Sequence, residues 1–201
     1  NIDKHYLKEL EDKGINIAST IFIEKNDLKS LKSIFKQTGW NEAVLKPSIS
    51  AGGRHTYRIN NNNIEQYESL FGELLKDESM MLQEFQNNIV SKGEVAHMIM
   101  GNTYTHSILK KAQSGDFRVQ DDFGGSIELY EASKEEIEFA MRVINSFGKE
   151  TTYARVDAFY DNNNHLALGE LEVMEPELWF RFNKKAADIM SDSVIDLLEK
   201  L

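Results

Sequence analysis

Cysteine is absent from this chain of 201 residues, and only two prolines occur, Pro47 and Pro176. Without cysteine the chain has neither a disulfide framework nor a thiol nucleophile. No apolar run approaches the roughly 18 residues that a membrane-spanning helix needs, and no signal peptide is visible at the start. The net charge of −10 argues against non-specific nucleic-acid binding. We therefore expect no membrane partner, no nucleic-acid partner and a cytoplasmic location.

The remaining composition, 41% hydrophobic and 28% charged, is typical of a globular protein. A chain of this length can form one large domain or two small lobes. The sequence begins at Asn1, without an initiator Met, and enters a helical pattern almost at once. We therefore expect a fragment that lacks an N-terminal domain of the same chain.

Residues 153–176 (YARVDAFYDNNNHLALGELEVMEP) alternate in polarity on both sides of an Asn-rich turn, which predicts a β-hairpin. Because side chains alternate between the faces of a strand, Arg155 shares a face with Asp157, and Glu170 shares a face with Glu172. The turn brings both pairs to the same side, so the four groups crowd a patch about 10 Å across. Three of them are carboxylates, which repel one another unless a cation lies between them.

This charged face has two interpretations. One is a divalent-metal site at the end of a buried hairpin, and the other is a solvated sheet face with alternating charges. We expect Leu166 and Leu168 on the carboxylate face, so that only one end of that face is polar. The opposite face carries residues that suit a core, namely Ala154, Val156, Ala158, Leu171 and Val173.

A second stretch, LKPSISAGGRHTYRI, places Lys46 at the end of a predicted strand, ahead of small residues and paired glycines. Backbone N–H groups are accessible there, so the loop can fold over phosphates, and Lys46 adds a point charge. A strand follows instead of a helix, which excludes a Walker-type loop. An ordinary Gly-rich hairpin loop remains the alternative.

Basic residues bracket a predicted turn at Gly115, where Arg118 and Gln120 alternate onto one face after Lys110. Cations near a carboxylate cluster suit a site in which phosphate oxygens and metal ions lie between them. A solvated basic edge is the alternative. The five histidines show no spacing typical of metal ligands, which favours ordinary polar roles.

Helix signals divide the rest of the chain. Asn26 is a candidate cap for a helix that ends at Gly39, and Ser133 with Glu136 forms a capping box for a helix to about residue 147. Further helical patterns cover residues 2–13, 64–75 and 183–201. We expect an α+β fold in which residues 1–15 form a leading helix, 16–80 a small lobe and 81–201 a larger lobe. The aromatics before the last helix suit a core, a substrate pocket or a dimer face, and they are Trp179, Phe180 and Phe182.

The order of these pieces resembles the ATP-grasp superfamily, and more closely the bacterial glutathione synthetase-like carboxylate–amine ligases. It runs from a Lys in the first helix through a strand with Lys-Pro and a Gly-rich loop to a strand ending in QEF. A GE, an Arg-x-Gln before Gly-Gly, an RxD and an ExE ahead of Pro follow. The resemblance spans nearly the whole chain. It implies an ATP-grasp fold, in which two α+β lobes hold ATP between antiparallel sheets.

The resemblance also implies individual roles. Residues implied at the nucleotide phosphates are Lys4, Lys46 and the loop of Ser50, Ala51, Gly52 and Gly53. Residues implied at the adenine and ribose are Gln83, Glu84, Phe85 and Glu94. Basic groups implied at the acyl-phosphate centre are Lys110 and Arg118, with Gln120 where the family has Asn. Asp157, Glu170 and Glu172 match the ligands of magnesium, for which manganese can substitute, and Arg155 suits a phosphate contact.

The implied reaction has two steps. ATP phosphorylates a substrate carboxylate, and an amine then attacks the acyl phosphate, so a small carboxylate and a small amine are the expected partners. Two departures stand out: the metal motif ends in Glu172 instead of Asn, and Ala96 stands where glutathione synthetase has a substrate-binding Arg. The second argues against glutathione synthesis itself. An ATP-binding module without catalysis, an ATP-grasp phosphotransferase and an unrelated α+β domain remain alternatives, and a homodimer remains open.

Overall fold

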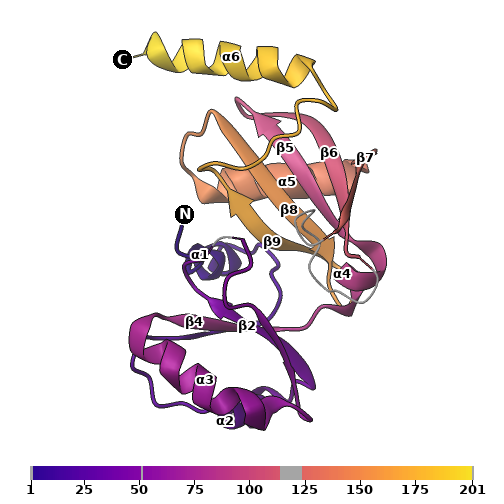
Figure 1. The fold of residues 1–201 in the computed structure, drawn as a ribbon. Coiled ribbons are helices and arrows are strands. Elements are labelled where there is room, and N and C mark those ends of the chain that lie inside the picture. Colours follow the sequence, from indigo (N-terminus) through magenta and orange to yellow (C-terminus); the bar gives the residue numbers. More distant parts are fainter. Residues whose placement is uncertain (1, 51, 114–123, 201) are drawn as a thin grey trace. The chain divides into compact units, whose positions relative to one another are not determined.

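The computed structural model of the chain describes residues 2–50, 52–113 and 124–200 (Figure 1). It divides into two compact units. The small unit comprises Ile2–Lys8 and Ala18–Phe85, and the large unit comprises Glu9–Ile17 and the described residues from Gln86 onward. Each unit has its own antiparallel sheet and helices, which confirms the predicted α+β class. No helix in the described ranges is both long enough and apolar enough to cross a membrane.

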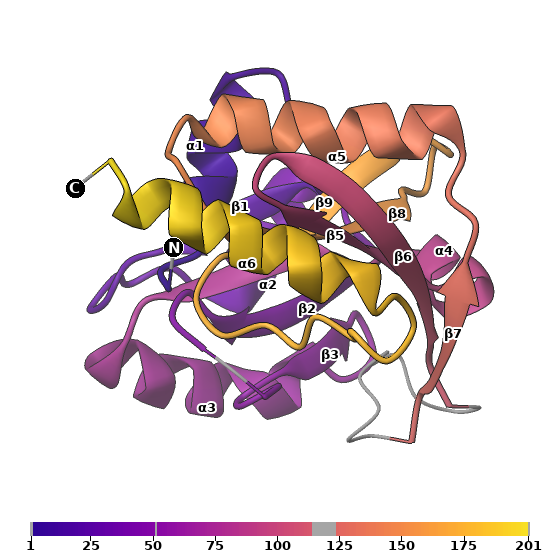
Figure 2. The same ribbon diagram turned by 90° about the horizontal axis from the view of Figure 1, so that it is seen from above.

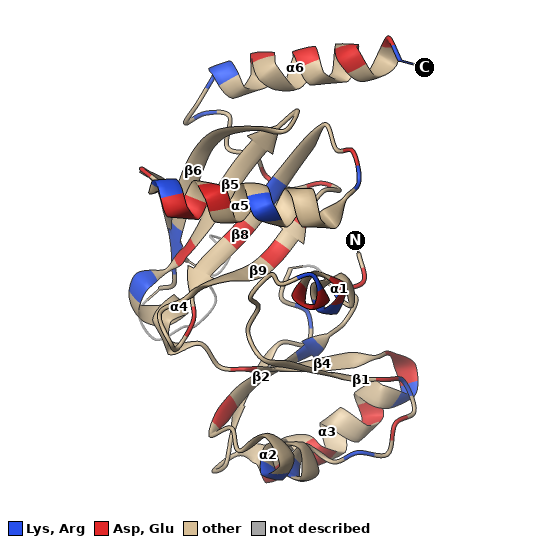
Figure 3. Ribbon diagram, turned by 180° about the vertical axis from the view of Figure 1, so that it is seen from behind, with Lys and Arg blue, Asp and Glu red and all other residues tan. Residues whose placement is uncertain are grey.

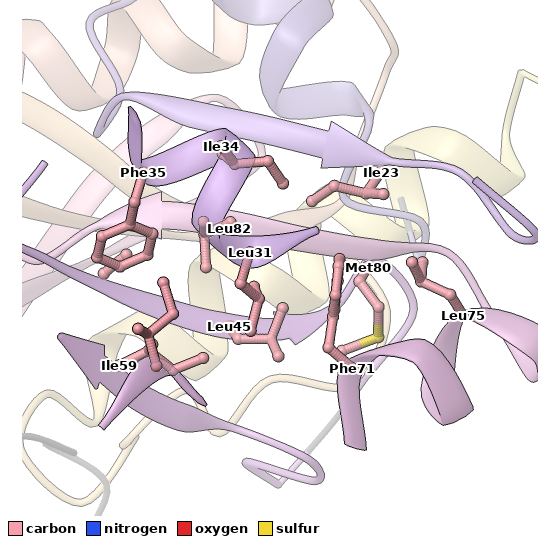
Figure 4. Packing of buried hydrophobic residues seen from close by; sticks show 12 residues of the cluster. Ile23, Leu31, Ile34, Phe35, Leu45, Ile59, Phe71, Leu75, Met80 and Leu82 are labelled. Carbon is pink, nitrogen blue, oxygen red and sulfur yellow. The ribbon is translucent and has the colours of Figure 1, made fainter. Parts of the chain in front are cut away.

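The small unit is built on a four-stranded sheet in the order β1-β4-β2-β3. Alternation along β2 buries Ala43, Leu45 and Pro47, so one face of this sheet lies on the core. Figure 4 shows Phe35, Leu45 and Phe71 among the buried side chains of this core, which belong to one hydrophobic cluster. The elements are β1 (Thr20–Ile23), α2 (Leu31–Thr38), β2 (Glu42–Pro47), β3 (Tyr57–Asn60), α3 (Ile64–Asp77) and β4 (Met80–Glu84).

The start of α2 differs from the prediction. Ser30 is the N-cap, and its side chain accepts a hydrogen bond from the backbone N–H of Ser33. The predicted cap, Asn26, lies in a turn with a φ of 66°, and Leu28 is 97% exposed instead of facing the core. Ser30 prevails because it immediately precedes Leu31, the first buried residue of the helix. The predicted end at Gly39 is confirmed by its left-handed C-cap conformation.

The large unit is built on a five-stranded sheet in the order β7-β6-β5-β8-β9. Gly101 and Asn102 have φ values of 52° and 63°, so the predicted turn between β5 and β6 has the left-handed backbone that suits a tight hairpin. Figure 2 shows α5 and α6 on opposite sides of this sheet. The elements are α4 (Asn87–Lys92), β5 (Glu94–Met100), β6 (Thr103–Lys111), β7 (Ser126–Tyr130), α5 (Lys134–Phe147), β8 (Tyr153–Tyr160), β9 (Leu166–Glu172) and α6 (Lys185–Leu198).

The limits of the units differ from the predicted boundaries at residues 15 and 80. Strand β4 counts with the small unit because it pairs with both β1 and β2. The first helix, α1 (Tyr6–Asp12), spans the change from one unit to the other. The chain after α1 counts with the large unit because Asn16 accepts a hydrogen bond from the N–H of Leu168 and Ile17 bridges to the same residue.

The capping box of α5 is confirmed: Ser133 accepts from the N–H of Glu136, whose carboxylate accepts from the N–H of Ser133. Replacing Ser133 by Ala removes one of these bonds, and we expect Ser133→Ala to lower the free energy of unfolding by about 1 kcal/mol. Urea denaturation followed by circular dichroism measures the change. Ser191→Ala, inside the exposed part of α6, is the matched control, and an equal loss there would contradict a capping effect.

A β-bulge in the β8–β9 hairpin corrects the predicted sidedness of two leucines. Asp157 pairs with Glu170, but the next residue, Ala158, pairs with Leu168, so Gly169 is an extra residue in β9. The residues of β9 that precede Gly169 therefore point to the opposite face from the one that simple alternation predicts. Leu166 and Leu168 lie on the core face with Ala158 instead of on the carboxylate face, because one inserted residue moves all earlier side chains to the other side.

Candidate functional site

A buried charged cluster lies on one face of the large-unit sheet. Lys110 Nζ on β6 is 2.8 Å from Asp157 Oδ2 on β8 and 2.5 Å from Glu94 Oε1 on β5. Arg155 holds Asp157 with two hydrogen bonds of 2.9 Å and also pairs with Glu172 on β9. Figure 3 shows acidic residues on β8 and β9. The predicted shared face is confirmed, since Arg155 is opposite Glu172 and Asp157 is opposite Glu170.

The electrostatics of the cluster centre on Asp157, which is 2% exposed. Burial alone would raise the pKa of this carboxyl, but Arg155 and Lys110 outweigh it and hold the pKa at about 2. Burial likewise disfavours the charged form of Lys110, but Asp157 and Glu94 prevail and its pKa is raised. The centre therefore holds a carboxylate between two cations at neutral pH.

Glu94 belongs to the cluster because the bulge residue, Gly169, has no side chain to occupy its space. A side chain at residue 169 would place its Cβ 2.9 Å from Glu94 Oε2, so Gly169 leaves the room that the carboxylate occupies. Glu94 and Lys110 are directly opposite each other across β5 and β6. Burial raises the pKa of Glu94 despite Lys110. Sequence reasoning assigned Glu94 to the ribose and missed this ion pair. A count outward from the Gly101-Asn102 turn puts Leu109 opposite Glu94, and only the register shift between Met98 and Ile99 brings Lys110 there.

Asp157, Glu170 and Glu172 provide the oxygen donors that magnesium prefers, and they occupy neighbouring positions on paired strands. Burial and the nearby Asp157 raise the pKa of Glu172 to about 7, so a cation would stabilise its ionised form. As the side chains stand, no three acidic or histidine residues in the described ranges are placed to hold a metal ion. Arg155 bridges Asp157 and Glu172, so an incoming ion has to compete with its guanidinium. The three carboxylates are chemically suitable ligands for magnesium, and the assignment of a metal site to them stays a prediction.

Trp179 lies beside Arg155 in the charged cluster, a contact that sequence reasoning missed. The Arg155 guanidinium carbon lies 5.2 Å from the centroid of the Trp179 ring, within reach of a cation–π interaction. Trp179 is 5% exposed and packs in a cluster against β5 and β6, with Phe180 and Phe182 partly buried beside it. Core packing is therefore the observed role of these three aromatics. His106 supports the segment by approaching the carbonyl of Leu178 at 3.2 Å.

The small unit brings its predicted phosphate-binding residues into two pairs. Lys4 is buried and donates to the carbonyl of Ser50 at 3.2 Å, so the first lysine contacts the Gly-rich loop. Gly52 and Gly53 have φ values of 62° and 70°, a left-handed backbone that presents N–H groups without a side-chain penalty. Strand β3 follows this loop, as predicted, instead of a helix.

Lys46 makes the second pair. Its Nζ donates to Gln83 Oε1 at 3.2 Å, from β2 to the neighbouring strand β4. The predicted adenine segment continues with Glu84 and Phe85, and the Phe85 ring is stacked under the guanidinium of Arg58 at 3.9 Å. Lys46 is therefore adjacent to the predicted adenine segment, and both belong to the small unit. The predicted residues Ala51, Arg118 and Gln120 lie outside the described residues.

Comparisons with known proteins add independent information. A family model described as prokaryotic glutathione synthetase, ATP-grasp domain, matches residues 8–176. The sequence has no match among curated proteins. Among solved structures, D-cycloserine synthetase DcsG is similar with a TM-score of 0.86 and 20% identity, over 98% of this chain and 70% of the other.

Two further solved structures extend the comparison. D-alanine–D-alanine ligase from Bacillus anthracis has a TM-score of 0.74 and 16% identity, over 99% of this chain and 69% of that one. The ATP-grasp ligase PsnB, in complex with its minimal precursor, Mg and ADP, has a TM-score of 0.65 and 16% identity, over 94% of this chain and 57% of that one. At these identities, the likeness is one of fold.

Proposed function

Because this chain belongs to the ATP-grasp domain family of prokaryotic glutathione synthetases, we propose that it takes part in ATP-dependent ligation of a carboxylate to an amine. The proposed route has ATP phosphorylate the carboxylate, after which the amine attacks the acyl phosphate and phosphate leaves. The buried cluster of Lys110, Arg155 and Asp157 carries this proposal. Two cations that a single carboxylate holds in place suit the stabilisation of negative charge on a transferring phosphoryl group.

Each predicted site residue has a proposed task. Lys4 and Lys46 neutralise the phosphates of ATP, and the N–H groups at Gly52 and Gly53 bind their oxygens. Lys110 and Arg155 stabilise charge at the acyl-phosphate centre, and the same task is proposed for Arg118. Gln83, Glu84 and Phe85 contact the adenine, Glu94 accepts from the ribose hydroxyls, and Ser50, Ala51 and Gln120 contribute to the nucleotide site.

We further propose that magnesium, or manganese in its place, binds at Asp157, Glu170 and Glu172. When bound, the ion supplies positive charge to the phosphate oxygens. We propose that the carboxylate and the amine are small molecules such as amino acids, or peptides. Ala96 is fully buried opposite Asp157 and provides no cation for a substrate carboxylate, which favours substrates other than those of glutathione synthesis.

Nucleotide binding can be tested by thermal unfolding with a non-hydrolysable ATP analogue and magnesium. We expect the analogue to raise Tm only when magnesium is present. Lys46→Met is expected to weaken binding of the analogue about 10- to 100-fold, because one charged hydrogen bond contributes about 1.5 to 3 kcal/mol. Lys76→Met, an exposed lysine of the same unit, is the matched control. An unchanged Tm in the parent chain would refute the nucleotide site.

The reaction itself is tested by ADP release across pairs of amino acids and dipeptides. Release that requires both a carboxylate and an amine supports ligation. Release with the carboxylate alone and a stable phosphorylated product indicates a phosphotransferase. A raised Tm with the ATP analogue and no ADP release for any pair indicates a binding module.

A further inference from the structure

A cavity of about 170 Å³ lies within the large unit, on the α5 side of the sheet. Val95 on β5 is opposite Leu109 and Ala158 on the neighbouring strands, and all three line the cavity with Leu166. Val95 alternates with Glu94, so these side chains lie on the face that points away from the charged cluster. Apolar cavities of about 150 Å³ are large enough to bind benzene. This cavity therefore has room for one six-membered ring.

His97 provides a polar wall that the proposed function does not use. It is fully buried, and its Nδ1 is 2.8 Å from Ser107 Oγ, which is 2.9 Å from the Tyr104 hydroxyl. Its Nε2 has no hydrogen-bond partner within the part of the chain that the structure describes. Because Nδ1 is engaged by Ser107 and His97 lines the cavity, Nε2 is the ring nitrogen that is left to pair with an occupant.

The protonation state of His97 limits which functional groups of an occupant can form a hydrogen bond with Nε2. Burial lowers the pKa of His97 to about 4, so the imidazole is neutral at pH 7. A neutral imidazole carries its proton on one nitrogen only, so Nε2 is a donor or an acceptor depending on the direction of the Ser107 bond. A hydroxyl group can pair with Nε2 in either case, because it both donates and accepts.

Two charged residues line this cavity. Lys92 is exposed, and its Nζ donates to Asn164 Oδ1 at 2.7 Å. Glu136 lines the cavity and is 2% exposed, and its carboxylate accepts from the Ser133 N–H and the Tyr130 hydroxyl. A second negative charge beside it in a buried site would be strongly disfavoured. The apolar side chains that line the cavity favour an occupant that is mostly apolar, and His97 favours one that carries a single hydroxyl group.

We propose that this cavity is a binding site for a small neutral molecule with one six-membered ring and one hydroxyl group, held by a hydrogen bond to His97 Nε2. The site lies on the opposite face of the sheet from Lys110 and Asp157, so it is separate from the proposed reaction centre. Binding there does not require nucleotide, and its test is independent of the proposed function.

Phenol is the probe and benzene is the matched comparison, titrated into the isotope-labelled chain and followed by NMR. We expect phenol to bind about tenfold more tightly than benzene, the difference that one neutral hydrogen bond makes. Phenol should shift the ¹⁵N resonance of His97 Nε2, and benzene should not. Equal affinities, or an unchanged Nε2 resonance at saturation, would mean that ordered water alone pairs with His97, and the proposal would be wrong.

Two variants locate the site. Leu166→Trp fills the cavity from its partly exposed edge, and we expect it to weaken phenol binding at least tenfold. Leu129→Trp is the matched control, because Leu129 is 58% exposed on β7 and does not line the cavity. Both variants are first compared with the parent by amide spectra. Phenol binding that survives Leu166→Trp, or fails equally in both variants, overturns the assignment, and the Nε2 resonance of the unmodified chain tests it without any variant.

Discussion

Asp157→Asn is expected to unfold more easily than the parent chain by about 3 to 5 kcal/mol at pH 7, the usual cost of breaking a buried ion pair. The variant leaves Arg155 and Lys110 buried without the carboxylate that both contact. It is also expected to lose ATP turnover by at least about 100-fold, since both cations lose their positioning. Urea denaturation and ADP release measure the two effects separately.

The pH dependence of this loss follows from the depressed pKa. Asp157 has a pKa of about 2 in the folded chain, against about 3.9 in an unfolded one. Its contribution is therefore fully present above about pH 4 and is lost as the pH falls toward 2. The gap between parent and Asp157→Asn should close over that window. A gap that stays constant between pH 7 and pH 3 would contradict the assignment.

Two controls separate folding from chemistry. Asp188→Asn, at an exposed position of α6, should change stability by less than about 0.5 kcal/mol. Glu170→Gln lies at a partly exposed position opposite Asp157 and should lower turnover with a smaller loss of stability. Turnover by Glu170→Gln at the parent rate would argue against a metal ion at this residue.

Lys110→Met is expected to lower the free energy of unfolding by about 3 to 5 kcal/mol, because it leaves Glu94 and Asp157 facing each other without the intervening cation. Lys111→Met is the matched control. The side chain of Lys111 is 49% exposed and pairs with Glu128 at the surface, so its removal should cost less than about 1 kcal/mol. Urea denaturation of both variants under the same conditions provides the comparison.

A double-mutant cycle tests the reason for that loss. Adding Glu94→Gln to Lys110→Met removes the carboxylate left without its cation, and we expect the double variant to regain about 1 to 3 kcal/mol relative to Lys110→Met alone. Glu94→Gln by itself should destabilise the chain, because it leaves Lys110 with one anion instead of two. Strict additivity of the two single changes would show that Glu94 and Lys110 do not interact.

Several features of this protein follow from local sequence alone. Alternation placed Arg155, Asp157, Glu170 and Glu172 on one face, because successive side chains of a strand must point to opposite sides. The capping box that begins at Ser133 was equally readable, since its hydrogen bonds join residues three apart. The resemblance to the ATP-grasp family also came from the order of motifs along the chain, and the family match agrees with it.

Tertiary structure decided what local patterns do not encode. The bulge at Gly169 depends on how β9 pairs with β8, and it moved Leu166 and Leu168 to the core face. The Lys110–Glu94 pair became buried only because β5 lies between β6 and β8, and the same strand order places His97 beside a cavity. Sequence determined which charges share a face, because that depends on neighbours in the chain. Strand pairing alone decided which of them are buried together, because burial depends on residues far apart in sequence.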